Sequence, residues 1–264
     1  MVFPPEGSAT ALRRGVGITD EQDEPLADQP LIAVVVPTFN EAENLPLLIQ
    51  QLRELDITGM GFVIVDDDSP DGTGKVADRL ASEFDGYFQV HHRAGKLGLG
   101  SAYVAGFKLA LDAGAEFIIE MDADLSHPTQ EVPELLQKLK QFDVVVGTRY
   151  SSGGDVDPSW NLGRRLLSRL GNIGIRTLVG VNVSDATSGF KGFRRSALEK
   201  VDLNDFRTTG FAFQAEMTMA CQRAGLSIGE HPYVFRTRNA GYSKMSAGIV
   251  YEAVVRLLPL RFRR

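Results

Sequence analysis

Five short runs of strand-forming residues alternate with helical patterns between residues 31 and 147, and this alternation limits the fold more than any other feature. The runs lie at 31–37, 61–66, 87–92, 115–121 and 142–147. The first run, LIAVVVP, is almost wholly apolar, as expected of a strand buried on both faces. Repeated strand–helix units predict an α/β fold, with an open, mostly parallel sheet and helices on both faces.

The segments between these strands carry helix signals. Asn40 is predicted to cap the first helix, with Glu43 as its capping-box partner. Asp71-Gly-Thr is predicted to open the second helix, and two more are expected at 98–113 and 129–140. After about residue 150 the pattern loosens. There we expect a continuation of the same domain that builds one side of its ligand site. Helices are expected at 162–178, 210–224 and 246–258, and short strands at 190–194 and 226–235.

Charge is concentrated at the two ends of the chain. Residues 1–30 hold six acids and two arginines, a net of −4 within a total of −6, with four prolines. They are predicted to form a disordered acidic tail. The acidic total argues against a nucleic-acid partner. The lone Cys221 excludes an intramolecular disulfide and a cysteine-based zinc site.

The C-terminal segment 248–264 is basic and amphipathic. No run of 18 apolar residues exists that could span a bilayer, and the N-terminus lacks the apolar core of a secretory signal. We therefore expect a cytoplasmic protein. The helix at 246–258 and the tail RLLPLRFRR are predicted to lie on an anionic bilayer surface, with Leu257, Leu258, Leu260 and Phe262 inward. The alternative is an ordinary core helix with a basic end.

Carboxylates gather where the predicted strands end. Glu41 follows the first strand, Asp66-Asp67-Asp68 ends the second, and Asp122-Ala123-Asp124 follows the fourth. One such aspartate alone could cap a helix. Ligands bind at the carboxyl ends of the strands in such sheets. Several carboxylates gathered there would repel one another unless they bind a common cation. Asp122 and Asp124 can both reach one ion, and their oxygens suit Mg²⁺ or Mn²⁺ with a nucleotide diphosphate.

Other chemistries fit the sequence poorly. The glycine-rich run GKLGLGS at 95–101 lacks the spacing of a nucleoside-triphosphatase loop. DDSPDG at 67–72 follows a strand and has Asp78 where a calcium loop needs glutamate. The four histidines have no zinc spacing, and no GxSxG motif of a hydrolase occurs.

Eight motifs occur in the order expected of a known family. They are VVVPTFNEAENL, VIVDDDSPDGT, GKLGLGSAYVAGF, MDADLSHP, VVVGTRY, DATSGFKGFRR, GFAFQAEM and RTRNAGYSKM. Across roughly residues 31–247 the chain resembles the polyprenyl-phosphate (dolichyl-phosphate) mannosyltransferases, inverting enzymes of glycosyltransferase family 2 with a GT-A fold. The resemblance implies transfer of mannose from GDP-mannose to a polyprenyl monophosphate.

The resemblance also implies a donor site. Phe39 would lie against the guanine, and Val65 and Asp67 would contact the base and ribose. The diphosphate and the Mg²⁺ or Mn²⁺ ion would be held by Asp122, Ala123 and Asp124. Ser126 stands where some relatives have a glutamine ligand, and it would act through a bridging water. The full set of implied donor-site residues is Pro37, Phe39, Glu41, Val65, Asp67, Asp122, Ala123, Asp124, Ser126, Arg149, Arg164, Arg238 and Lys244.

The implied chemistry needs little beyond positioning and charge neutralisation. A metal with arginine and lysine donors would stabilise the departing diphosphate, which gives catalytic roles to Asp124, Arg149, Arg238 and Lys244. The acceptor, a phosphate dianion near Ser188, Gly189 and Phe190, would need no general base. Glu216 either orients a substrate or is a polar group on a buried helix. The loop 238–244 either closes over the donor or is a solvated charged loop.

Two other functions remain open at the level of sequence. One is a polyprenyl-phosphate glucosyltransferase that uses UDP-glucose, because such enzymes share several of the motifs. The other is a non-catalytic subunit that binds a sugar nucleotide, although Asp122, Asp124, Arg149 and Lys244 are all present. A membrane protein that anchors this chain at the cytoplasmic face is a further expected partner.

Overall fold

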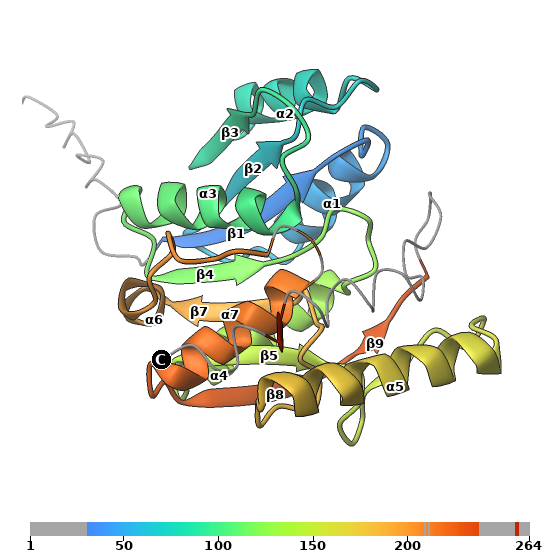
Figure 1. Cartoon of the computed structure of the whole chain (residues 1–264). Helices are drawn as coiled ribbons and strands as arrows, with labels where there is room; N and C mark the ends of the chain where they lie inside the picture. The colour runs from blue at the N-terminus through green and yellow to red at the C-terminus, as the bar shows by residue number, and fades with distance from the viewer. Residues whose placement is uncertain (1–30, 209, 211, 238–256, 259–264) are drawn as a thin grey trace, which may run out of the picture.

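The computed structural model describes residues 31–208, 210, 212–237 and 257–258. Its centre is a seven-stranded sheet with the order β3-β2-β1-β4-β7-β5-β8 (Figure 1). The strands are β1 (Ile32–Thr38), β2 (Met60–Asp66), β3 (Phe88–His92), β4 (Phe117–Glu120), β5 (Val144–Thr148), β7 (Lys191–Arg194) and β8 (Ile228–Pro232). Strands β6 (Asp155–Val156) and β9 (Val234–Phe235) pair separately.

The predicted α/β class and mostly parallel sheet are confirmed. Strand β7 is the exception, because it runs antiparallel to both of its neighbours, β4 and β5. The other pairs of the large sheet are parallel. Their carboxyl ends therefore meet on one side of the molecule, where ligand sites of open α/β sheets lie.

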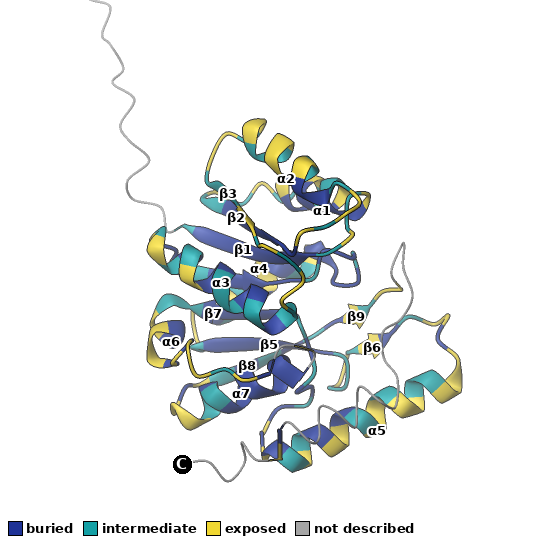
Figure 2. Ribbon diagram, turned by 45° about the horizontal axis from the view of Figure 1, so that its top comes forward, coloured by how far each residue is buried: buried dark blue, intermediate teal, exposed yellow. Residues whose placement is uncertain are grey.

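Helices cover both faces of the sheet (Figures 1 and 2). Alternate residues of β1 belong to two apolar clusters, Val35 to one and Val34 and Val36 to the other, which explains why this strand is apolar throughout. The helices are α1 (Asn44–Arg53), α2 (Thr73–Ser82), α3 (Leu99–Asp112), α4 (Val132–Leu139), α5 (Leu162–Val179), α6 (Arg195–Lys200) and α7 (Ala212–Arg223), with a 3₁₀ turn at Thr129–Glu131.

The predicted capping box at Asn40 and Glu43 is wrong. Helix α1 begins at Asn44, and Glu43 is its N-cap without a side-chain capping bond. Asn40 has a φ of 62°, a left-handed conformation that asparagine tolerates well. Its backbone N–H donates to Ser69 Oγ at 3.0 Å, so this loop closes against the turn after β2. The loop thereby carries Phe39 and Glu41 to the sheet edge.

The C-terminal membrane prediction needs correction at Leu257. This side chain is fully buried in the apolar cluster that also contains Phe107 and Phe213, so it does not face a bilayer. Leu258 is 45% exposed. The rest of the predicted basic segment and the acidic segment 1–30 lie outside the described residues. Among the helices that the structure describes, none has the length and apolarity needed to cross a membrane.

Candidate active site

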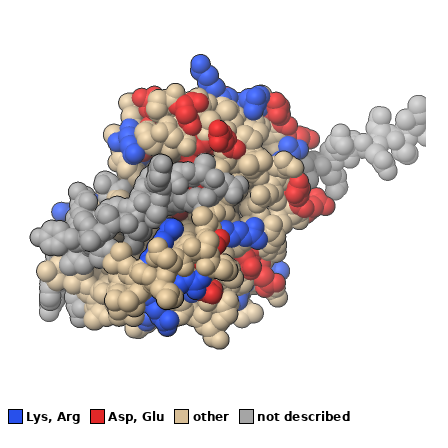
Figure 3. Space-filling model, turned by 90° about the vertical axis from the view of Figure 1, so that its right-hand side faces the viewer, with Lys and Arg blue, Asp and Glu red and all other residues tan. Residues whose placement is uncertain are grey.

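A pocket of about 330 Å³ opens at the carboxyl ends of the parallel strands. The structure brings together there many of the residues that the sequence assigns to the nucleotide: Pro37, Phe39, Glu41, Asp67, Asp122, Ala123 and Asp124. Lys96, Gly98, Leu99, Ala102 and Gly210 complete much of the wall. Figure 3 looks onto this side of the molecule and shows acidic and basic side chains interspersed over it.

Phe39 has a cationic neighbour that sequence reasoning missed. Lys96 Nζ lies 3.8 Å from the centroid of the Phe39 ring, within the range of a cation–π contact. Both residues line the pocket, so an aromatic face and a positive charge stand together at its wall. The run GKLGLGS contains Lys96, but its spacing alone gives no reason to place it beside Phe39.

Asp67 is held by a second missed residue, Arg93. Arg93 Nη1 lies 2.7 Å from Asp67 Oδ1, and the Gly98 backbone N–H donates to Oδ2 at 3.2 Å. Burial raises the pKa of Asp67 above its ordinary value, and the Arg93 charge and the backbone bonds oppose that rise. These contacts fix the carboxylate at the pocket wall.

The Asp122-Ala123-Asp124 segment is anchored through its first carboxylate and its turn. The Tyr103 hydroxyl donates to Asp122 Oδ1 at 2.8 Å, and the Asp122 backbone N–H donates to His127 Nδ1 at 3.2 Å. Burial lowers the pKa of His127, which keeps its ring neutral and able to accept. Asp124 Oδ1 accepts from the Ser126 N–H at 3.0 Å, across Leu125 in a left-handed conformation.

These residues fit a hard divalent cation. Asp122 and Asp124 both line the pocket and offer carboxylate oxygens. The Ser126 hydroxyl is buried and has no hydrogen-bond partner among the described residues, so its oxygen has no competing bond there. Within the described part of the chain, no three His, Cys, Asp or Glu side chains converge as a metal cluster. With Asp122 and Asp124 as its protein ligands, a Mg²⁺ ion would keep positions for water and substrate phosphates.

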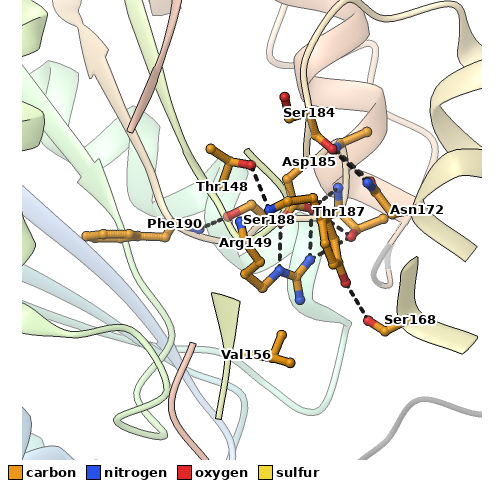
Figure 4. Close-up of polar contacts among 12 residues, drawn as sticks. Thr148, Arg149, Val156, Ser168, Asn172, Ser184, Asp185, Thr187, Ser188 and Phe190 are labelled. Atoms are coloured by element: carbon orange, nitrogen blue, oxygen red, sulfur yellow. Dashed lines mark hydrogen bonds and ion pairs between the residues drawn. The ribbon is translucent and has the colours of Figure 1, made fainter. Parts of the chain in front are cut away.

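Arg149, predicted at the donor phosphates, lines a different cavity, and Figure 4 shows the polar contacts of its side chain. This cavity has a volume of about 420 Å³, and its wall also contains Tyr150, Asp155, Arg165 and Arg169. Arg149 donates to Asp185 through Nε at 2.6 Å and through Nη2 at 2.8 Å, and Nη2 also donates to Thr187 Oγ1. Burial alone would lower the pKa of Arg149. The charge of Asp185 outweighs this and raises that pKa above its ordinary value, so Arg149 stays cationic.

One short segment contacts a residue of each cavity, Arg149 of one and Asp122 of the other. Asp185 and Thr187 bind Arg149, and two residues later Gly189 lies against Asp122. A Cβ at Gly189 would stand 3.4 Å from Asp122 Oδ2, so the backbone there closely approaches the carboxylate. The DATSG run therefore links the arginine-lined cavity with the carboxylate-lined pocket.

Several predicted contact residues have buried side chains. Val65, Ser188 and Phe190 are at most 1% exposed, and the Phe190 ring stacks on His127. In this structure Val65 and Phe190 offer no side-chain surface to a substrate, which leaves Gly189 as the approachable part of the predicted acceptor segment. Glu216 accepts hydrogen bonds from the backbone N–H groups of Arg207 and Thr208. Of its two interpretations, these contacts favour a polar group on a buried helix.

Arg164, another predicted cation, does not line the carboxylate-lined pocket. The Arg164 guanidinium lies over the Trp160 ring at 3.6 Å, and Arg164 is not among the residues lining either cavity. Arg238 and Lys244 lie outside the described residues. Sequence reasoning also missed Lys191, which is fully buried 3.8 Å from Glu120 and donates to Ser188 O and Gln214 Oε1. Burial raises the pKa of Glu120 to about 7.

Comparison with known proteins identifies the class to which this fold and site belong. The family model described as Glycosyl transferase family 2 matches residues 33–202, and the chain belongs to that family. An undecaprenyl-phosphate mannosyltransferase of Micrococcus luteus is 41% identical over 224 residues, covering 85% of this chain and 91% of that protein. A polyprenol monophosphomannose synthase of Mycolicibacterium smegmatis is 40% identical over 225 residues, which cover 85% of this chain and 84% of that protein.

Solved structures agree on the fold. Glucosyl-3-phosphoglycerate synthase from Mycobacterium tuberculosis, in complex with Mn²⁺, UDP and glucosyl-3-phosphoglycerate, superposes with a TM-score of 0.60 at 20% identity. The match covers 88% of this chain and 80% of that one. A second structure of the same enzyme, with UDP alone, gives a TM-score of 0.61. The expected GT-A fold is thus confirmed.

Proposed function

We propose that this protein transfers a mannosyl group from GDP-mannose to a polyprenyl phosphate, with inversion at the anomeric carbon. The two mannosyltransferase relatives, at 41% and 40% identity, support the transferred sugar and the lipid acceptor. The observation that carries the proposal is the pairing of a carboxylate-lined pocket with an arginine-lined cavity through the 185–189 segment. A transferase of this kind must hold two phosphorylated substrates side by side.

The carboxylate-lined pocket would hold the donor. Phe39 would stack on the base, and Asp67, fixed by Arg93, would accept from a donor hydroxyl. Asp122 and Asp124, with Ser126 nearby, would hold Mg²⁺ or Mn²⁺. When bound, such an ion neutralises charge on the leaving diphosphate. Arg238 and Lys244 stay proposed as further cations around that diphosphate.

The arginine-lined cavity would hold the acceptor phosphate. Arg149 presents a fixed, permanently charged guanidinium there, with Arg165 and Arg169 beside it. A phosphate monoester with a second pKa of about 6 is largely a dianion at neutral pH. Its oxygen would bond to the anomeric carbon as the bond from that carbon to the diphosphate breaks, so GDP leaves without a general base. The chain's task is to align the two substrates.

Helix α5 supports contact with a membrane, where such an acceptor resides. It extends along the lower edge of the molecule, and its outer side is exposed (Figures 1 and 2). Leu162, Leu166, Leu170 and Ile173 share one helical face and are 83%, 59%, 56% and 46% exposed. The helix has four arginines and no acid. An exposed apolar face bordered by arginines fits an anionic bilayer surface, for which we propose the cytoplasmic face.

A donor-competition assay tests the proposed function. Purified full-length protein is given polyprenyl phosphate, Mg²⁺ or Mn²⁺, and labelled GDP-mannose, with unlabelled UDP-glucose as competitor. We expect labelled lipid that UDP-glucose does not suppress. Suppression of the labelled lipid by UDP-glucose, with transfer of glucose from labelled UDP-glucose in a parallel reaction, would overturn the donor assignment. Binding of GDP-mannose without any transfer would overturn the catalytic assignment.

A further inference from the structure

Tyr103 reaches from helix α3 to the first carboxylate of the proposed cation site. Its side chain is fully buried, and its hydroxyl donates to Asp122 Oδ1 at 2.8 Å. The ring lies between Phe107 and Phe213, stacked on both at centroid distances of 5.9 and 6.0 Å. Two aromatic neighbours on α3 and α7 therefore fix the direction in which the hydroxyl points.

Close packing of α3 brings Tyr103 within reach of Asp122. A Cβ on Gly106 would overlap Val35 of β1, so this glycine lets the helix lie directly on the sheet. At the start of the same helix, a Cβ on Gly100 would stand 2.8 Å from Phe213 Cβ. The glycines in the run GLGSAYVAGF thus set the position of the tyrosine.

Asp122 is constrained on both sides. Its backbone N–H is bonded to His127, and Gly189 lies beside its Oδ2. With Oδ1 occupied by the tyrosine hydroxyl, Oδ2 is left to a ligand.

We infer that Tyr103 is a positioning residue, which holds the Asp122 carboxylate in the orientation that binds the divalent cation and the donor diphosphate. This inference rests on the proposed function, since it requires a cation at Asp122 and Asp124. Hydrogen bonds from outer residues to metal-binding carboxylates typically change metal affinity by about 10–100-fold when removed.

The test measures Mn²⁺ binding by electron paramagnetic resonance, alone and with GDP, for wild type and Tyr103→Phe. We expect about 10–100-fold weaker binding in Tyr103→Phe, by analogy with other carboxylate partners. Tyr87→Phe is the matched control, because Tyr87 donates to Gln89 at the start of β3, away from the pocket, and should leave Mn²⁺ affinity unchanged. Equal affinity in wild type and Tyr103→Phe would overturn the inference.

A double-mutant cycle separates positioning from a general loss of structure. If Tyr103 acts through Asp122, Tyr103→Phe should change Mn²⁺ affinity no further in an Asp122→Ala background. An equal loss in both backgrounds would show a merely structural role and overturn the inference. A wild type that binds no Mn²⁺ would overturn the cation site itself, a failure distinct from an unaffected Tyr103→Phe.

Discussion

The guanidinium of Arg149 and the carboxylate of Asp185 form a bidentate pair, with Nε–Oδ2 and Nη2–Oδ1 distances of 2.6 and 2.8 Å (Figure 4). The Asp185 side chain is fully buried and that of Arg149 is 10% exposed. Removing one partner of such a pair leaves the other charge buried without compensation. The pair therefore both stabilises the fold and sets the charge of the arginine-lined cavity.

Asp185→Asn should lower the unfolding free energy at pH 7 by about 3–5 kcal/mol, because Arg149 loses its counter-charge. Burial alone would raise the pKa of Asp185. The Arg149 charge and the hydrogen bonds that Asp185 accepts outweigh this and lower that pKa below its ordinary value. Its stabilising effect is therefore present above the unfolded pKa of about 4 and is lost as pH falls through the lower folded value. Urea unfolding across this range should show wild type and variant converging toward acid pH.

The control for this pair is Asp155→Asn. Asp155 lies 3.7 Å from Arg165, but both side chains are substantially exposed, so the change should be within about 1 kcal/mol. A stability difference between wild type and Asp185→Asn that stays constant from neutral to acid pH would contradict the assigned charge pair.

Phe39→Leu should weaken donor binding with little change in turnover. Stacking of a base on an aromatic ring contributes about 1–3 kcal/mol, so KM for GDP-mannose should rise roughly tenfold or more. Because base stacking acts equally in ground and transition states, kcat should change little. Phe84→Leu serves as control, since Phe84 is a partly buried residue that packs on Phe62 and Phe88, away from the pocket wall. A raised KM in Phe84→Leu alone would argue against Phe39 as the base platform.

Leu166→Asp with Leu170→Asp should release the protein from vesicles that contain anionic lipid. The change places two charges in the exposed apolar face of α5, where bilayer contact is proposed. Sedimentation with vesicles measures the effect. Leu47→Asp is the matched control, because Leu47 is a singly exposed leucine on α1. Vesicle binding that survives the double change would assign membrane contact elsewhere.

The strand–helix alternation was sufficient to predict the fold class, because each unit is local in sequence. The place of β7 between β4 and β5 was not predictable in this way, since pairing between distant strands leaves no mark in a short pattern. The same limit explains the missed partners. Asp185 is 36 residues from Arg149 and Tyr103 is 19 from Asp122, so only the folded chain brings them together. Asn40 failed as a cap because a long-range bond to Ser69 decided its conformation.

The most direct test of the account is mannose transfer from GDP-mannose to polyprenyl phosphate, measured for wild type and Asp124→Ala with and without EDTA. We predict transfer by the wild type that EDTA abolishes and that added Mg²⁺ or Mn²⁺ restores. Activity of Asp124→Ala should be reduced by at least about 100-fold, because the variant would hold poorly the cation that stabilises the transition-state charge. Full activity of Asp124→Ala, or of the wild type in EDTA, would contradict the account.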